Sequence, residues 1–131
     1  MPTSPSLASE WPATKPIILT DLFTLANSPE RIDWQPFRPG VAIHMLYGER
    51  TQGPSAALLK YAPGATVPTH EHTGYEHIVV LSGSQQDHQG THLAGSLVIN
   101  PPGTHHDIVS PDGCIVLIIW EKPVTLREEN S

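Results

Sequence analysis

The alternation of apolar and polar positions along the chain predicts a series of short β-strands. Residues 41–47 (VAIHMLY) alternate with a period of two, although both alternating sets contain apolar side chains and leave the inward face open. Residues 56–61 are predicted to form another strand, which ends at the pair Pro63-Gly64. Residues 78–81 are a β-branched apolar run followed by the turn signal Ser82-Gly83-Ser84, and residues 114–120 are continuously apolar, as in a strand buried on both faces.

The first part of the chain is less regular. Residues 17–25 are the first apolar segment, and the pattern is compatible with a strand or with a short helical turn before the turn signal of residues 27–30. Residues 1–16 contain four prolines and no apolar run long enough for a signal peptide or a membrane span, which predicts a flexible N-terminal arm. We therefore expect one domain over residues 17–125 and a polar C-terminal tail over residues 126–131.

Composition narrows the fold class and the function classes. With 131 residues the chain is long enough for one domain with a real core, and 14 prolines, 10 glycines and 15% charged residues favour many short strands joined by turns. The predicted class is all-β, as a small jelly-roll β-barrel that hides its strand edges and leaves one mouth for a ligand. A net charge of −6 without a basic run argues against nucleic acid as a partner.

Three residues with strand spacing suggest a metal site. His70, His72 and Glu76 have the same parity, and residues two apart share a face on a strand but not on a helix. Pro68 and Gly74 disfavour a helix here, so we expect extended backbone, bent at most locally near Gly74. One strand could then supply three ligands.

His106 is the natural fourth ligand. The rigid turn Pro101-Pro102-Gly103 would set the entry of the strand that carries it, and His105 would then point to the opposite face. Period two says only that one of this pair faces inward, so the choice of His106 depends on the motif spacing described below.

The remaining histidines and the cysteine have simpler interpretations. Residues 87–90 (Asp87-His88-Gln89-Gly90) are expected to form a polar hairpin, so His88 and the nearby His92 are expected to be solvated. His44 is more readily a wall residue than one that faces the barrel interior. The single cysteine, Cys114, excludes an internal disulfide, and its apolar neighbours predict a buried, unreactive thiol. Nothing in the sequence indicates an oxidising compartment, so we expect a cytoplasmic protein.

The two stretches that carry the candidate ligands, residues 64–83 and 95–110, resemble the two motifs of the cupin superfamily. The first, G-x5-H-x-H-x3-E-x6-G, runs from Gly64 through the two histidines and the glutamate to Gly83, and the second, G-x5-P-x-G-x2-H-x3-N, begins at Gly95. Ser110 stands where the family often has Asn, which affects only a structural hydrogen bond. Residues 57–65 and 110–114 further resemble the cupin half of ChrR-type anti-sigma factors.

The resemblance implies an RmlC-like jelly roll with a divalent metal ion inside the barrel, held by His70, His72, Glu76 and His106, with positions open toward the mouth. This ligand set suits Zn(II) or Fe(II), and also Ni(II), Mn(II) or Co(II). ChrR relatives imply zinc, and relatives that cleave diketones or hydroxyketones imply non-haem iron.

The leading hypothesis is a dioxygenase-like enzyme that chelates a small diketone or hydroxyketone in the barrel. Tyr75, His77 and Glu71 could support such a site, but their parity places them on the opposite face. The alternative is a non-catalytic small-molecule or oxidative-stress sensing module; a third hypothesis is an isomerase-type or structural cupin with a vestigial metal. Residues 1–63 contain no cysteine for a zinc site of a sigma-binding domain, so sigma-factor binding is not expected from this chain. A homodimer is expected, because sheet edges often pair in this family.

Overall fold

Ten strands form a curled antiparallel sheet in the computed structural model, which describes residues 14–126. Two short helical segments precede the strands: α1 (Leu22–Ala26) and the 3-10 helix η1 (Pro29–Arg31). The strands are β1 (Gln35–Arg38), β2 (Val41–Tyr47), β3 (Ser55–Tyr61), β4 (Ala65–His72), β5 (Glu76–Asp87), β6 (Gly90–Leu93), β7 (Leu97–Asn100), β8 (His105–Ser110), β9 (Cys114–Trp120) and β10 (Val124–Leu126). The predicted all-β class is confirmed.

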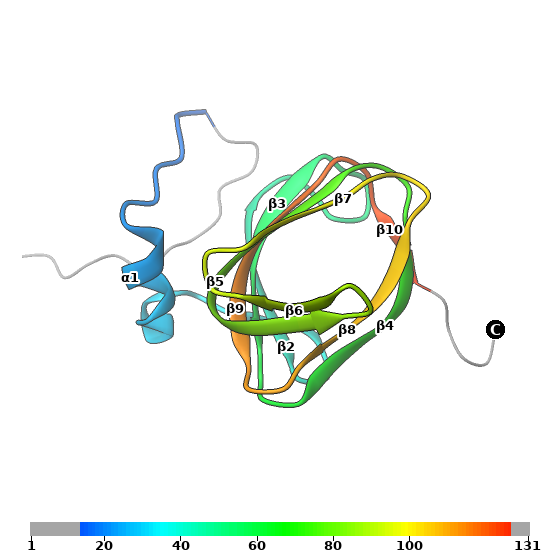
Figure 1. Ribbon diagram of the computed structural model, residues 1–131. Helices are drawn as coiled ribbons and strands as arrows, with labels where there is room; N and C mark the ends of the chain where they lie inside the picture. Colours follow the sequence, from blue (N-terminus) through cyan, green and yellow to red (C-terminus); the bar gives the residue numbers. More distant parts are fainter. Residues whose placement is uncertain (1–13, 127–131) are drawn as a thin grey trace, which may run out of the picture.

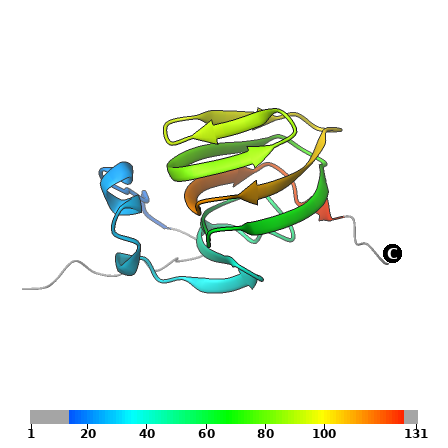
Figure 2. The ribbon, with the colours of Figure 1, turned by 60° about the horizontal axis from the view of Figure 1, so that its bottom comes forward.

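The strands follow the order β1-β2-β3-β9-β5-β8-β4-β10, and β6 and β7 each pair with β5. Viewed along its axis, this sheet curls into a ring, and the turned view shows the strands stacked across one another (Figures 1 and 2). The hydrogen-bonded path begins at β1 and ends at β10, and β6 and β7, which among the described strands each pair only with β5, also leave one edge free. Residues of both β1 and β10 line a cavity in the interior.

Strand β5 belongs to both sides of the curl. Its first half pairs with β7 and β9, and its last residues pair with β6 and β8. The expectation that a turn at residues 82–84 ends this strand is wrong. The strand bends there instead, with a register shift between Val80 and Ser82 and a positive φ of 72° at Gly83, because the residues beyond the bend find new backbone partners in β6.

Gly83 also allows the backbone to approach β9 closely. A Cβ atom at this position would lie 2.0 Å from the carbonyl oxygen of Gly113, so any other residue would push the two segments apart. The bend of β5, and with it the curl of the sheet, therefore depends on this glycine.

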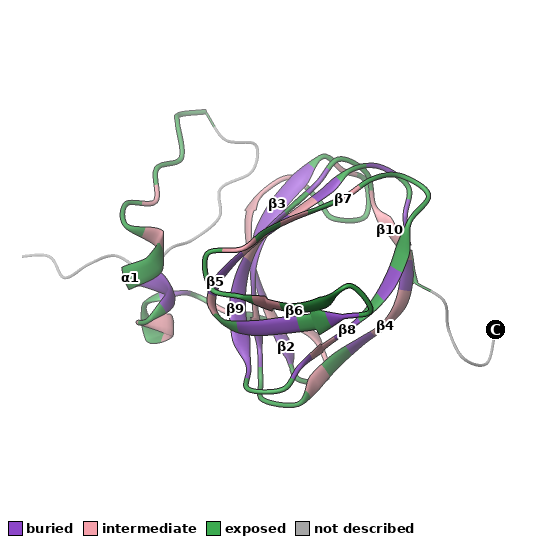
Figure 3. Ribbon diagram, in the orientation of Figure 1, coloured by how far each residue is buried: buried purple, intermediate pink, exposed green. Residues whose placement is uncertain are grey.

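Most of β3 and β9 is buried (Figure 3), and apolar side chains pack on both faces of these strands. Inside the curl, Leu59, Val116 and Ile118 belong to the main core. Outside it, Leu58 and Ile115 pack with Leu25 and Ala26 of α1 in a second cluster. This arrangement explains most of the apolar run at residues 114–120, because β9 is covered on both faces over most of its length, although Ile119 is 36% exposed.

The two interpretations of residues 17–25 are resolved in favour of a helical turn, since α1 begins at Leu22 and its buried Leu25 contributes to the outer cluster. Asp21 caps this helix by accepting a hydrogen bond from the backbone N–H of Thr24. Most of the predicted N-terminal arm lies outside the described residues, as does the chain beyond Leu126. No helix within residues 14–126 is long and apolar enough to cross a bilayer.

Candidate metal centre

Four buried side chains converge inside the curled sheet. One ligand atom from each of His70, His72, Glu76 and His106 lies within 4.8 Å of the corresponding atom of every other member, and none of these residues is more than 5% exposed. First-row metal–nitrogen bonds of about 2.1 Å allow two ligand atoms to lie up to about 4.2 Å apart. The cluster would need only a small inward movement to close on one ion.

The four side chains come from three strands. His70 and His72 lie on β4, Glu76 is the first residue of β5, and His106 is on β8 opposite His70 in the register. The prediction that one strand supplies three ligands is therefore wrong. The chain ends one strand at His72 and begins the next at Glu76, so the local bend near Gly74 is a crossing between two parts of the sheet.

Hydrogen bonds at Nδ1 orient the first two imidazoles. His70 Nδ1 lies 3.0 Å from the carbonyl oxygen of Pro68, which can only accept, so Nδ1 carries the proton. His72 Nδ1 lies 2.9 Å from the hydroxyl of Thr104, and this hydroxyl donates its own proton to Pro101 O at 2.6 Å. His72 Nδ1 must therefore also be the donor. In both rings the lone pair is left on Nε2, which faces the cluster.

The third imidazole is held by a carboxylate. Asp87 Oδ2 accepts from His106 Nδ1 at 3.0 Å, while Asp87 Oδ1 accepts from the backbone N–H of Gln89 at 2.9 Å and from His92 Nε2 at 3.0 Å. A carboxylate on the outer nitrogen of a histidine fixes its tautomer and increases its basicity as a ligand. The sequence placed Asp87 in a hairpin turn without a role, and His92, expected to be solvated, instead supports Asp87.

Glu76 is also fixed at both oxygens. Oε1 accepts from Asn100 Nδ2 at 3.1 Å, and Oε2 accepts from the indole N–H of Trp120 at 2.9 Å. Burial raises the pKa of this carboxyl, but a hydrogen bond from His72 and the positive charge of His72, His70 and His106, when these imidazoles are protonated, lower it below the ordinary value. The carboxylate is ionised and aimed at the histidines.

The Nε2 atoms of His72 and His106 are buried and have no hydrogen-bond partner within the described part of the chain. They lie 3.1 and 3.8 Å from Glu76 Oε1. Burial lowers the pKa of His70 and of His106, which favours neutral rings whose lone pairs face a carboxylate oxygen. Acceptors gathered in this way repel one another unless a cation lies between them, so the donor set fits a divalent metal ion.

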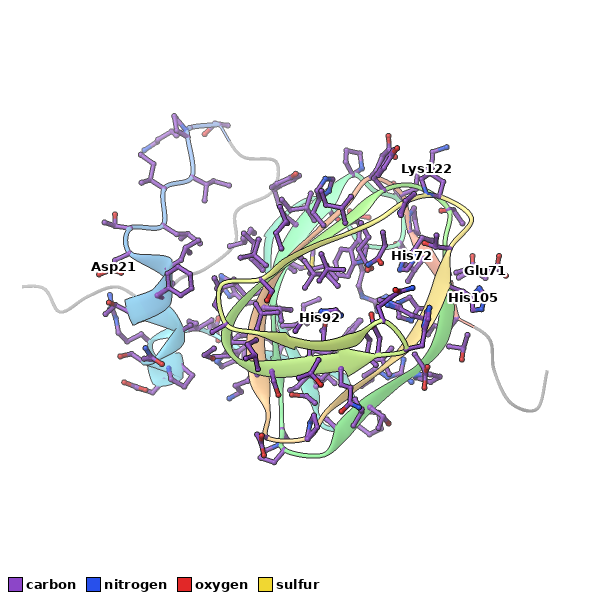
Figure 4. All side chains as sticks on the ribbon, viewed as in Figure 1. Asp21, Glu71, His72, His92, His105 and Lys122 are labelled. Carbon is purple, nitrogen blue, oxygen red and sulfur yellow. The ribbon has the colours of Figure 1, made fainter. Side chains whose placement is uncertain are left out.

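The neighbours of these residues point away from the centre, as the strand period predicts. His105 is exposed and pairs across the ladder with Glu71, and both labels lie on the outer side of the ribbon, whereas His72 lies on the inner side (Figure 4). Tyr75 is 47% exposed and stacks loosely against His77 at a centroid distance of 6.3 Å. The choice of His106 over His105 as the inward residue is confirmed.

The structure also tests the expectations for His44, His88 and Ser110. His44 is buried on the outer side of β2, where Nδ1 bonds Asp33 O at 2.9 Å, so it is a wall residue. His88 is exposed, as expected. Ser110, which replaces the usual Asn, donates to Ser84 O at 2.6 Å, so a structural hydrogen bond is present despite the shorter side chain.

Comparison with known proteins shows which family this chain matches. The model of the ChrR cupin-like domain matches residues 24–124. In the crystal structure of Rhodobacter sphaeroides SigE in complex with the anti-sigma ChrR, a chain with 29% sequence identity aligns over 70% of this chain and 47% of its own length, with a TM-score of 0.58.

Two other similarities concern proteins named as enzymes. An acetylacetone dioxygenase from Acinetobacter johnsonii has the same fold, with a TM-score of 0.69 over 95% of this chain and 85% of its own, at 15% identity. The curated protein "Putative dimethylsulfoniopropionate lyase DddL" from Cereibacter sphaeroides is 33% identical over 64 residues. That match covers 46% of this chain and 28% of the lyase, so this chain spans well under half of that protein.

Proposed function

We propose, from the premise that this chain belongs to the ChrR cupin-like domain family, that it binds one divalent metal ion in the barrel and acts on a small molecule there. In its most specific form, the proposal is a dioxygenase-like enzyme that takes a small diketone or hydroxyketone. His70, His72, Glu76 and His106 would hold the ion.

The observation that carries the proposal is the protonation pattern of the cluster. Each imidazole donates from Nδ1 to a fixed acceptor, so its Nε2 lone pair faces inward, and two of these nitrogens are buried without a partner in the described chain. A cluster built only for packing or hydrogen bonding would not keep such atoms unpaired, because each costs roughly 1–3 kcal/mol.

Nitrogen and oxygen donors without thiolate suit Fe(II), Zn(II), Ni(II), Mn(II) or Co(II). A bound ion would supply Lewis-acid polarisation of a chelated oxygen donor and, if it is Fe(II), the redox chemistry of dioxygen. Fe(II) suits the proposed reaction with dioxygen, and Zn(II) is the other leading choice.

The protein's own part would be to bind and orient the substrate in a dry space. A cavity of about 380 Å³ reaches His70 and Glu76, and its walls include the apolar side chains of Leu59, Val67 and Ile118. This volume lies at the small end of the range for ligand pockets, which suits a compact substrate. Because Trp120 and Asn100 hold both oxygens of Glu76, that carboxylate would keep its position as substrate enters.

The test begins with the metal content of protein purified without a metal-affinity resin. Iron-reconstituted protein is then given pentane-2,4-dione or a hydroxyketone, and oxygen consumption is measured. We expect stoichiometric metal and substrate-dependent oxygen uptake, both lost in His72→Ala and both retained in His105→Ala. A protein that binds no metal under any loading condition would overturn the proposal.

The second candidate is a non-catalytic sensing module, favoured by the 29% identity to the ChrR-containing structure. In that case the metal-loaded protein would bind a small molecule, detected as a shift in melting temperature, without consuming oxygen or changing the ligand. Oxygen uptake that depends on substrate and on His72 would exclude it. Sigma-factor binding remains not expected from this chain.

A further inference from the structure

The cavity beside the metal centre is bordered by two arginines. Its lining includes Phe37 and Arg38 of the edge strand β1 and Val124 and Leu126 of the edge strand β10, and it extends to His70 and Glu76. Arg50, in the loop between β2 and β3, also lines it.

The two arginines differ in their position and contacts. Arg38 is the last residue of β1 and is half-buried, and the Arg50 guanidinium lies 4.9 Å from the centre of the Phe37 ring, a cation–π contact. Within residues 14–126 neither guanidinium forms an ion pair with a carboxylate. Since a guanidinium presents a fork of donors that matches an oxyanion, two such groups lining one cavity form a receptor for an anion.

The charge around the cavity supports this interpretation. Among the residues of the described chain that line it, Glu76 is the only acidic one, and both of its oxygens already accept hydrogen bonds from Trp120 and Asn100. The two arginines therefore leave the cavity positive although the whole chain carries a net charge of −6. A cleft of one sign with low-dielectric walls concentrates ligands of the opposite sign.

Tyr61 adds a neutral polar group to the wall of the cavity. Burial raises the pKa of its phenol well above the ordinary value, and the hydrogen bond with Gln85 and the charge of Arg38 oppose that rise only in part. The phenol therefore stays protonated and adds no negative charge to repel an anion.

We propose that the substrate or ligand is a small organic acid whose carboxylate pairs with Arg38 and Arg50 at the mouth, while its other end carries the oxygen donors that reach the metal centre. This inference rests on the proposed function and narrows it from neutral diketones and hydroxyketones to their anionic counterparts. Arg38, which is the less exposed of the two, makes the larger contribution.

A matched pair of probes tests the inference. In 4,6-dioxoheptanoate a carboxylate replaces the terminal methyl group of heptane-2,4-dione, and the diketone end is the same in both. We expect Zn(II)-loaded wild-type protein to bind the anion about ten- to hundred-fold more tightly, measured by calorimetry, because a charge-assisted hydrogen bond to a desolvated carboxylate has that effect. The preference should shrink as KCl is raised.

The variants assign the effect to the two arginines. Arg38→Gln/Arg50→Gln should bind both probes equally, Arg38→Lys should keep part of the preference, and Arg31→Gln, which removes an exposed arginine of η1, should leave it unchanged. Equal binding of both probes by the wild type, or a loss in Arg31→Gln as large as in the double variant, would overturn the inference.

The metal-free protein separates this inference from the proposed function, because pairing of guanidinium with carboxylate needs no metal. If the protein takes up no metal but still prefers the anion, the proposed function fails, and of the inference only the pairing of the carboxylate with the two arginines stands. If it binds metal and both diketones equally, the proposed function stands and the inference fails.

Discussion

Asp87→Asn should weaken metal binding although residue 87 touches no metal. Asp87 Oδ2 accepts the Nδ1 proton of His106 at 3.0 Å, and Oδ1 is already shared by the backbone of Gln89 and by His92. An asparagine that keeps its oxygen on those two donors must turn its NH2 group toward His106. His106 Nδ1 would then have to accept, and its proton would move to Nε2, which is the atom that faces the cluster.

The size of the effect follows from the role of such supporting residues. Loss of a partner on the outer nitrogen of a metal-binding histidine costs about 10- to 100-fold in metal affinity. At free metal equal to 100 times the wild-type Kd, binding stabilises the folded protein by about 2.7 kcal/mol, and this gain falls to about 1.4 or 0.4 kcal/mol in the variant. For a chain of this size, that is a loss of roughly 4–9 °C in the metal-induced rise of Tm.

The assay compares Tm with and without Zn(II) within each variant, so that any effect of the substitution on the metal-free protein cancels. A competition titration against a chelator gives Kd independently. Asp107→Asn is the matched control, because Asp107 is an exposed carboxylate on β8 next to His106 and should leave the metal-induced rise unchanged. The reasoning is refuted if Asp87→Asn keeps the wild-type rise, or if Asp107→Asn loses as much.

Four further predictions follow from the same geometry. His106→Ala should lose its metal, as measured by elemental analysis, and His105→Ala should keep it; the opposite result would show that the register on β8 is wrong. Metal-free protein should be less stable at acid pH, since burial lowers the pKa of His70 and His106 below that of the unfolded chain, and the unfolded state then takes up protons that the folded state does not. Its free energy of unfolding in urea should therefore fall below about pH 6.5, by up to about 1.4 kcal/mol per pH unit for each histidine, and a flat profile from pH 7.5 to 5.5 would contradict this. Cys114 should react slowly with a thiol reagent in the native protein, because burial raises its pKa to about 11; rapid labelling without denaturant would disprove it. Light scattering at micromolar concentration tests the homodimer, and a monomer would contradict that prediction.

Strand period and motif spacing were sufficient to predict much of this protein. The parity of His70 and His72, with the turn that precedes His106, predicted which histidines would meet, and the apolar run at residues 114–120 predicted a strand that is covered on both faces over most of its length. Glu76 was also predicted in the cluster, but it joins from a second strand. These predictions succeed because they depend only on local backbone geometry. In a strand, the period of two fixes the face to which each side chain points.

The predictions that were wrong or left open depend on contacts between distant parts of the chain. Whether the chain bends at Gly83 or ends a strand there depends on backbone partners in β6, and the helical choice at residues 22–26 depends on the apolar face of distant strands that α1 covers. Such outcomes are set by pairing between segments far apart in sequence, which local propensity does not record.

The residues that support the metal centre and its cavity could also not be predicted from the sequence. Trp120 reaches Glu76 across 44 positions, Asp87 reaches His106 across 19, and Arg38 joins the cavity from the opposite edge of the sheet. Each of these residue types has ordinary roles in turns, cores and surfaces, so its identity carries no signal of the contact. The inward histidines could be predicted because they share strands whose period fixes their direction, whereas their hydrogen-bond partners depend on how the whole sheet curls.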